Sequence, residues 1–207
     1  MISISISRTA ETLAWLIAIV YATIPTYWMA VHPFARFWQS RRGKVMPFLG
    51  LIWLALWIVA GFATASYRHQ RVWPAWSWII SLPLLVLGAG LYRRLGHFDR
   101  AKLSGQAEVR PQEHAQQLVT TGMHGRVRHP IYLAHLLMLT GWTIGAGTIA
   151  LVALWCFAVV TGVFLILFED RELEARFGEE YRAYKQRVPA VVPSFSPRTR
   201  EDTEEFR

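Results

Sequence analysis

The sequence predicts an all-α fold, a polytopic membrane helix bundle with about five transmembrane helices and a cytoplasmic C-terminal helical segment. Of its 207 residues, 53% are hydrophobic and only 17% are charged, whereas soluble domains carry about a quarter charged residues. The apolar residues gather in runs of about 20, long enough to cross a hydrocarbon core of about 30 Å. We therefore expect one membrane-embedded domain over residues 1–193. The polar residues 194–207 are expected to form a disordered tail.

The formal net charge of +8 could suggest a nucleic-acid partner. The basic residues instead stand beside apolar runs, as the positive-inside rule describes for cytoplasmic loops. We therefore predict contact with membrane lipid and no nucleic-acid partner. The single cysteine, Cys156, excludes an intrachain disulfide and gives no evidence for a Cys-rich metal site.

The first expected span covers residues 12–31. A signal peptide is the alternative, but the run continues past Pro25 to Tyr27 and Trp28, which is long and aromatic for a signal. Residues 32–45 contain no acidic residue and predict a cytoplasmic loop, with the basic side chains Arg36, Arg41, Arg42 and Lys44. The second span, residues 47–65, returns the chain to the outer side.

The third span begins at an interfacial belt of tryptophans, Trp73, Trp76 and Trp78, and ends near Tyr92. Arg93 and Arg94 mark the return to the cytoplasm, although Arg68 and Arg71 fall on the outer side. Residues 95–128 form the long polar loop between spans, and such loops are often functional. Gly88-Ala89-Gly90 lies within an apolar helix with no preceding strand, which indicates packing and not a nucleotide-binding turn.

The fourth span, residues 131–144, is short, and a turn at Gly145-Ala146-Gly147 leads into the fifth, residues 149–168. Gly141 and Gly145 have the spacing of small residues that lets two helices approach closely, here predicted to be the fourth and fifth. The hairpin should bring Arg128 and Glu169 to one side of the membrane. This topology places the amino end outside and the carboxyl end in the cytoplasm.

Residues 169–184 read as two short helical pieces separated at Gly178, a residue suited to ending a helix. Apolar and aromatic side chains recur there at helical spacing, at Leu173, Phe177, Tyr181 and Tyr184. Pro189 and Pro193 then end regular structure.

Polar residues at the two ends of the hairpin could bind one ligand. Pro130 suits the first position of a helix, and free N–H groups there, with Arg128, favour an anion such as a carboxylate. Glu169 could take an ammonium group, so that the site would hold a zwitterion. An aromatic surface for a base or a sulfonium could come from Tyr132, Tyr181 or Trp142. The alternative is that Arg128 is an interface anchor and that Glu169 and Asp170 are solvated charges.

Residues 118–132, Leu-Val-Thr-Thr-Gly-Met-His-Gly-Arg-Val-Arg-His-Pro-Ile-Tyr, resemble a signature of the isoprenylcysteine carboxyl methyltransferase family. Residues 169–189, from Glu169-Asp170 through Phe177-Gly178 to Arg187-Val188-Pro189, resemble its C-terminal signature. The resemblance implies S-adenosylmethionine as methyl donor, bound in a membrane pocket that faces the cytoplasm. It also implies a lipophilic acceptor that enters laterally. The motif-bearing core is residues 112–193.

The same resemblance implies the roles of individual residues. Those that would bind the cofactor are Leu118, Val119, Gly122, His124, His129, Tyr132 and Glu169. Arg128 and Arg187 would hold or neutralise an acceptor carboxylate as catalytic residues. The chain departs from the family pattern where His124 replaces a usual tyrosine, Ala134 a glycine, Asp170 a second glutamate and Ala190 an arginine. These departures leave the acceptor open.

The predicted function is transfer of a methyl group to a lipophilic acceptor, foremost the carboxylate of a prenylcysteine-like substrate. The alternatives are a phosphatidylethanolamine-type N-methyltransferase, a small-thiol S-methyltransferase, and a non-catalytic transport or assembly factor. The expected location is the inner membrane of a prokaryote or the endoplasmic reticulum of a eukaryote. No metal is predicted, because the spacings of His124, His129 and His135 do not share one helical face. His135 either faces the pocket or is a satisfied interior histidine.

Overall fold

The computed structural model describes residues 2–34, 37–38, 45–95 and 117–193. Regular structure in these ranges is helical apart from one isolated bridge between Arg71 and Thr148. The α-helices are α1 (Ile2–Val31), α3 (Val45–Thr64), α4 (Trp78–Arg94), α7 (Pro130–Ala146), α8 (Ile149–Phe177) and α9 (Glu179–Arg187). The predicted all-α fold is confirmed. The basic residues of the first predicted loop and the tail at 194–207 lie outside the described residues.

Within the ranges that the structure describes, four helices are long and apolar enough to cross a membrane: Arg8–Val31, Pro47–Tyr67, Ala75–Arg94 and Ile149–Phe177. The fourth expected span, α7, is apolar but has only 17 residues. At 1.5 Å per residue it is about 25 Å long, shorter than a bilayer core of about 30 Å. The 18-residue apolar window of α3 is only 6% buried inside the bundle, which leaves this helix to face lipid.

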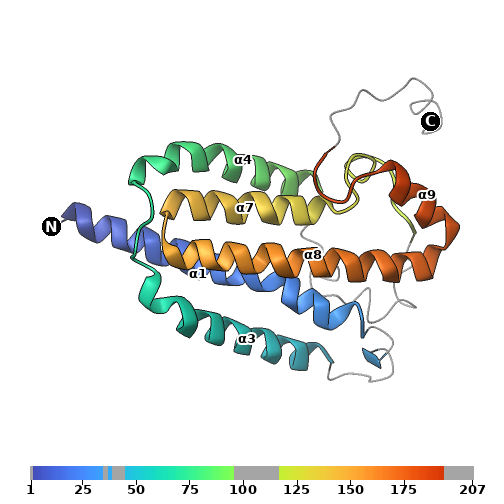
Figure 1. Cartoon of the computed structure of the whole chain (residues 1–207), viewed down its shortest axis with the longest axis horizontal. Coiled ribbons are helices and arrows are strands. Elements are labelled where there is room, and N and C mark those ends of the chain that lie inside the picture. Colours follow the sequence, from blue (N-terminus) through green and yellow to red (C-terminus); the bar gives the residue numbers. More distant parts are fainter. Residues whose placement is uncertain (1, 35–36, 39–44, 96–116, 194–207) are drawn as a thin grey trace.

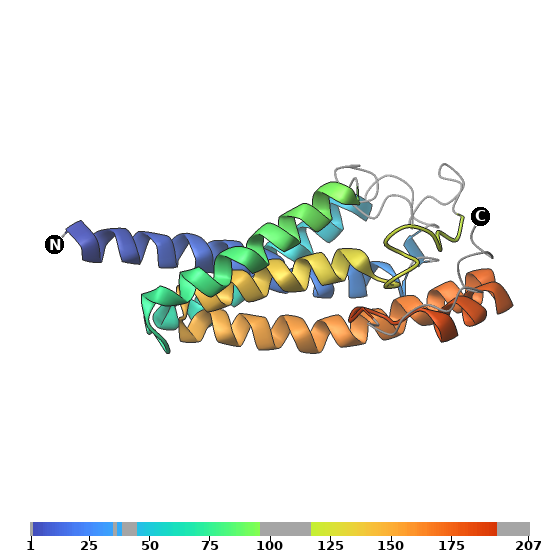
Figure 2. The ribbon, with the colours of Figure 1, turned by 90° about the horizontal axis from the view of Figure 1, so that it is seen from above.

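Successive long helices run in alternating directions, so α1 begins and α8 ends at opposite ends of the bundle (Figures 1 and 2). The α4 and α7 helices pack closely together, and α1 lies along α8. The short α9 helix folds back beside the far end of α8 (Figure 1). This arrangement brings the start of α7, the end of α8 and α9 together.

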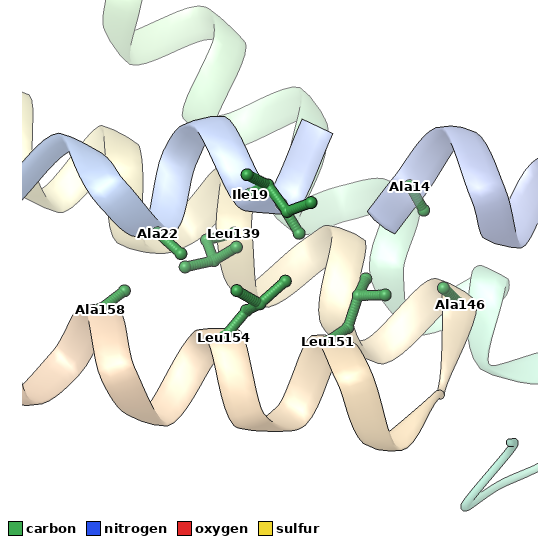
Figure 3. Close-up of a cluster of buried hydrophobic side chains, with 9 residues drawn as sticks. Ala14, Ile19, Ala22, Leu139, Ala146, Leu151, Leu154 and Ala158 are labelled. Atoms are coloured by element: carbon green, nitrogen blue, oxygen red, sulfur yellow. The ribbon is translucent and has the colours of Figure 1, made fainter. Parts of the chain in front are cut away.

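The main core lies where α1 meets α7 and α8 (Figure 3). Three alanines at four-residue intervals on α1, Ala14, Ala18 and Ala22, are fully buried. They belong to one cluster with Leu139 of α7 and with the α8 residues Leu151, Leu154 and Ala158. Small side chains on one helix let large ones on its neighbour fill the space, which suits helix packing in lipid.

The small residues of α7 face α4 and not α8, so the prediction that they join the fourth and fifth spans is wrong. A Cβ atom added to Gly145 would lie 2.4 Å from the Trp78 ring, and one added to Gly141 would lie 2.8 Å from Leu85. The Ser81 hydroxyl donates to the Gly141 carbonyl oxygen at 2.7 Å. The spacing indicates a close neighbour but does not identify which helix it is.

The predicted packing role of Gly88 is confirmed. A Cβ atom added to this α4 residue would lie 2.9 Å from Met138 and 3.2 Å from the carbonyl oxygen of Ala134. The two helices therefore approach each other at small residues on both sides.

The end of the bundle opposite α9 is held by a loop between α3 and α4. The Val72 N–H donates to the carbonyl oxygen of Gly147, whose φ of 63° ends α7 in a left-handed conformation. Arg71 Nη1 and His69 Nδ1 each lie 2.9 Å from the carboxylate of Glu11, a buried residue of α1. One of the two arginines that break the positive-inside pattern is thus neutralised within the protein.

The two helical pieces expected in residues 169–184 are not both separate helices. The α8 helix continues without interruption through Phe177 and ends at Gly178, whose φ is 59°. The predicted end at Gly178 is confirmed, but the first of the two expected short pieces is the extension of the membrane helix itself. Glu169 and Asp170 therefore stand on one continuous helix.

Candidate functional site

The two polar segments singled out in the sequence meet at one end of the bundle, as predicted. Arg128 and His129 precede α7, and Tyr132 lies in its first turn. The Tyr132 hydroxyl donates to Glu169 Oε2 at 2.6 Å. Arg128 Nη2 donates to Asp170 Oδ2 at 2.8 Å. The hairpin of α7 and α8 thus closes a network of basic, acidic and phenolic groups.

Asp170 is the centre of this network. It is 3% exposed, and besides Arg128 its carboxylate contacts His129 Nε2 at 3.1 Å and Lys185 Nζ at 3.5 Å. The hydroxyl of Tyr181 also donates to it. From the sequence, Asp170 was expected to be a solvated charge or a departure from a family glutamate, and its central position was not predicted. The sequence feature that could have indicated it is the row of apolar and aromatic residues at helical spacing, which continues past Gly178 to Tyr181. This row packs α9 back against α8, where Tyr181 reaches Asp170.

The segment Val188–Ala190, here called the C-terminal strap, binds the start of α7. The N–H groups of Arg128 and His129 donate to the carbonyl oxygens of Pro189 and Ala190, at 2.8 and 2.9 Å. Arg128 Nη1 donates to the carbonyl oxygens of Val188 and Lys185. The N–H groups at the start of α7 were expected to be free for an anion, but that of His129 is engaged by the strap. Residue spacing does not reveal that the chain after α9 returns to this helix start.

His129 bridges the two carboxylates. Its Nε2 lies 3.1 Å from Asp170 and its Nδ1 lies 3.4 Å from Glu169. Burial alone would lower the pKa of His129, but the hydrogen bonds and negative charges of Asp170 and Glu169 outweigh burial and raise the pKa to about 9. His129 is therefore an imidazolium at neutral pH, with an N–H directed to each carboxylate.

Glu169 is the more accessible of the two acids. Its side chain is 20% exposed, against 5% for Asp170. The Tyr132 ring stacks on the His129 ring, with centroids 5.4 Å apart and an angle of 14° between the planes. His32, at the end of α1, is buried and lies 3.6 Å from Glu172, one turn beyond Glu169. The Glu169 carboxylate therefore has the Tyr132 ring and the positive charge of His129 beside it.

Only one of the three predicted aromatic partners adjoins Glu169. Tyr132 does so, whereas Tyr181 is 1% exposed and directed to Asp170. Burial and the charge of Asp170 raise the pKa of Tyr181 far above its usual value, so this phenol remains a hydrogen-bond donor. Trp142 packs edge-on against Trp78, towards the other end of α7. These two rings therefore have other partners than Glu169.

The loop before α7 lies against α9. Leu118 packs on the buried cluster of Tyr181, Tyr184 and Val188, and the Tyr184 hydroxyl donates to the carbonyl oxygen of His124 at 2.7 Å. Val119 is 53% exposed, and Gly122 has a φ of 62°. The structure thus fixes the loop against α9, beside the network.

Arg187 closes α9, and its side chain is exposed. Among the residues with described positions, no group of three or more His, Cys, Asp or Glu side chains is arranged to hold a metal ion.

Comparison with known proteins identifies the region that carries this site. The profile of the phospholipid methyltransferase family matches residues 78–180. Methanethiol S-methyltransferase 2 of Bradyrhizobium diazoefficiens is 27% identical over 168 residues, which are 80% of this chain and 52% of the relative. Protein-S-isoprenylcysteine O-methyltransferase B of Arabidopsis thaliana is 32% identical over 124 residues, which are 56% of this chain and 60% of the relative.

Methanethiol S-methyltransferase 1 of the same bacterium is 40% identical over 70 residues, which are 32% of this chain and 23% of the relative. The chain thus spans about half the length of the first of these relatives and less than two thirds of the others. No solved structure matches the chain significantly. Through residues 78–180, which extend from the start of α4 to the first turn of α9, this multi-pass membrane protein belongs to the phospholipid methyltransferase family.

Proposed function

We propose that this protein is an S-adenosylmethionine-dependent methyltransferase that acts on a lipophilic acceptor from within the membrane. The observation that supports it best is the partly exposed carboxylate of Glu169, held by Tyr132 and His129 where α7 and α8 meet. This group lies within the region that matches the family.

The residues at this end of the bundle fit a cationic, zwitterionic methyl donor. When bound, S-adenosylmethionine supplies a methyl group made electrophilic by its sulfonium. The Glu169 carboxylate would attract the donor's ammonium group, and the Tyr132 ring would flank its positive charge. The imidazolium of His129 holds both side chains in place and offers a positive charge to the donor's carboxylate. We propose that Leu118, Val119, Gly122 and His124 line the cofactor from the loop before α7.

The reaction needs little covalent chemistry from the protein. His129 is already protonated and held by two carboxylates, so it is not a proton acceptor. Catalysis would come from aligning the acceptor with the methyl group and from excluding water. A carboxylate acceptor is anionic at neutral pH and requires no base. An arginine near it must orient it without holding it more tightly than the transition state.

The acceptor we propose first is the carboxylate of a prenylcysteine-like substrate, supported by the similarity to the Arabidopsis relative. Arg128 and Arg187 would serve this carboxylate in different ways. The guanidinium of Arg128 is engaged by Asp170 and two backbone carbonyl oxygens, so its main effect would be to hold the strap. Arg187 is exposed one residue before the strap and would make the direct contact.

A small thiol is the second candidate acceptor. The observation in its favour is the alignment with methanethiol S-methyltransferase 2, which covers 80% of this chain. A thiol would not need either arginine, but it must lose its proton before it attacks.

Two measurements test the proposal. Calorimetry in detergent should detect binding of S-adenosylmethionine to the wild type and at least a tenfold weaker affinity for Glu169→Ala. The matched control is Glu179→Ala, because the Glu179 side chain is 84% exposed. Labelled methyl groups should then appear on an S-farnesylcysteine derivative or a small thiol, with phosphatidylethanolamine as the third probe. Absence of donor binding to the folded wild type would refute the enzyme and favour a non-catalytic membrane factor.

The role of Arg187 has its own test. Arg187→Ala should lower turnover of the farnesylcysteine probe while donor affinity stays within a factor of two. An equal loss of donor affinity would contradict an acceptor-side role.

A further inference from the structure

Arg68, at the end of the bundle opposite α9, forms no ion pair with any carboxylate of the described residues. Its side chain makes one hydrogen bond among them, from Nη1 to the carbonyl oxygen of Ala65 at 2.6 Å. Its guanidinium lies over the ring of Trp15 on α1, 5.7 Å from the centroid. The neighbouring Arg71 is instead paired with Glu11. The positive charge of Arg68 is therefore available to a partner from outside the bundle.

This arginine stands at one end of an apolar groove between α1 and α3 (Figure 1). The groove has a volume of about 540 Å³, within the range of about 300–1,000 Å³ that is usual for ligand pockets. Trp15 and Ala65, the two residues that Arg68 contacts, both line it. Its α3 side is one stripe at helical spacing, made of Leu54, Trp57, Ile58, Gly61, Phe62 and Ala65.

The groove has the length of one membrane leaflet. Its lining on α3 extends over eleven residue steps, a rise of about 16 Å, and half of a hydrocarbon core is about 15 Å. Two hydrogen bonds tie the helices together near its ends, from Trp15 Nε1 to Thr64 at 2.8 Å and from Trp53 Nε1 to Thr23 at 3.0 Å. The first lies beside Arg68, where α3 ends, so the groove runs from the membrane surface to about mid-membrane.

We propose that this groove binds an anionic phospholipid, with one acyl chain along α3 and the phosphate at Arg68. Lipid tails are as apolar as the groove, so the groove alone would not distinguish one lipid from another. The guanidinium makes the distinction, because its planar N–H groups form paired hydrogen bonds with phosphate oxygens. An anionic head group adds no cation of its own, whereas choline does. This inference does not depend on the proposed methyltransferase function.

A second copy of this chain fits the groove less well than a lipid does. A twofold dimer through the groove would bring the Arg68 of each copy to the same depth of one interface, where like charges repel. A lipid also meets the surface as it is, since the apolar window of α3 is only 6% buried. A bound lipid would contact both α1 and α3 and would therefore hold α3 against the bundle.

Thermal unfolding of the protein in a nonionic detergent tests the head group. Dioleoylphosphatidylglycerol and dioleoylphosphatidylcholine have the same acyl chains, and we expect the first to raise the unfolding temperature of the wild type more. Arg68→Gln should weaken the apparent affinity for phosphatidylglycerol by about fivefold or more. The matched control is Arg171→Gln, which removes an equal charge from an exposed position on α8. It should bind both lipids as the wild type does.

Gly61→Leu tests the place of the acyl chain. A Cβ atom added to Gly61 lies 3.7 Å from Ile19 Cδ1, an ordinary contact, so the leucine fits the backbone and its side chain occupies the groove. This variant should lose the shift that phosphatidylglycerol produces. The control is Gly50→Leu on the same helix, where nothing lies within 4 Å of the added atom. Similar unfolding temperatures of the two variants without added lipid would show that α3 still packs against α1.

Four outcomes would overturn the lipid site. Equal stabilisation of the wild type by both lipids would mean that no head group is recognised. An equal loss in Arg171→Gln and Arg68→Gln would mean that the net charge of +8 alone attracts the lipid. A full phosphatidylglycerol shift in Gly61→Leu would place the acyl chain elsewhere. A wild-type dimer that Gly61→Leu converts to a monomer, measured by light scattering, would assign the groove to a second copy.

Discussion

Glu169 and Asp170 are neighbours in sequence with different surroundings. Consecutive residues of a helix project about 100° apart, so only one of them can face the buried network. Asp170 does so, and Glu169 keeps its side chain 20% exposed. We expect Asp170→Asn to lower the free energy of unfolding by about 3–5 kcal/mol, because two buried cations lose their counter-charge. Thermal unfolding in detergent measures this change.

Glu169→Gln tests the role of the neighbouring acid and is compared with Asp170→Asn. It keeps an oxygen that can accept from Tyr132, so its stability should stay within about 1 kcal/mol of the wild type. Its affinity for S-adenosylmethionine should fall at least tenfold, because the negative charge is lost. Glu179→Gln should change neither quantity. Equal destabilisation by the two acid variants would contradict the separation of their roles.

His129 makes stability depend on pH in a defined direction. Its pKa in the folded protein is about 9, above the value of about 6.5 of an unfolded histidine. The folded state therefore binds the proton more tightly. The stabilisation, on the order of 3 kcal/mol, is fully present below about pH 6.5 and is lost as pH rises through about 9.

His129→Gln isolates this contribution from other titrating groups. The difference in unfolding free energy between wild type and variant should be largest near pH 6 and should shrink steadily up to pH 9.5. Thermal or denaturant unfolding in one detergent across that range checks it. A difference that grows with pH would mean that the imidazole is neutral in the fold.

Close helix packing in this protein occurs at glycines, and the structure shows which helix each glycine contacts. Gly145→Ala would place a methyl group 2.4 Å from the Trp78 ring, in the tight contact of α7 with α4. We expect it to lower the free energy of unfolding by about 1–3 kcal/mol through overpacking. Gly162→Ala on α8 is the control, because nothing lies within 4 Å of its added Cβ atom. There, the higher helix propensity of alanine should stabilise slightly or have no effect. Equal unfolding temperatures for both variants would contradict the α4–α7 contact.

The sequence predicts helices better than it predicts their partners. Apolar runs locate most span ends to within a few residues, but α1 begins well before its run and α8 continues well beyond its own. Pro130 and Gly178 mark a helix start and end correctly. Which helices pack together depends on side-chain shape over long separations, as the contact of Gly145 with Trp78 shows. The hairpin predicts that Arg128 and Glu169 lie at one end of the bundle, because a short turn joins its two helices. The strap bonds between Pro189 and Arg128 have no periodic signature, so they were missed.

The distribution of basic residues predicts how the bundle is oriented in the membrane. Arg93 and Arg94 end α4 at the same end of the bundle as the Glu169 network. At the other end, Arg71 is neutralised by the buried Glu11 and adds no net charge. The positive-inside rule therefore predicts that the Glu169 end faces the cytoplasm.

Labelling with a membrane-impermeant maleimide in intact cells tests this orientation. Cys156 is first replaced by alanine, and single cysteines are introduced by Glu179→Cys at the network end and Gln70→Cys at the other, both at exposed positions. The Gln70→Cys protein should be labelled from outside, whereas Glu179→Cys should react only after the membrane is permeabilised. The reverse pattern would put Glu169 on the outer face, away from the cytosolic supply of S-adenosylmethionine, and the proposed reaction could not then run at this site. Labelling of both cysteines from one side would instead mean that the chain does not cross the membrane three times between residues 70 and 179. The short α7 would then be the helix that fails to span.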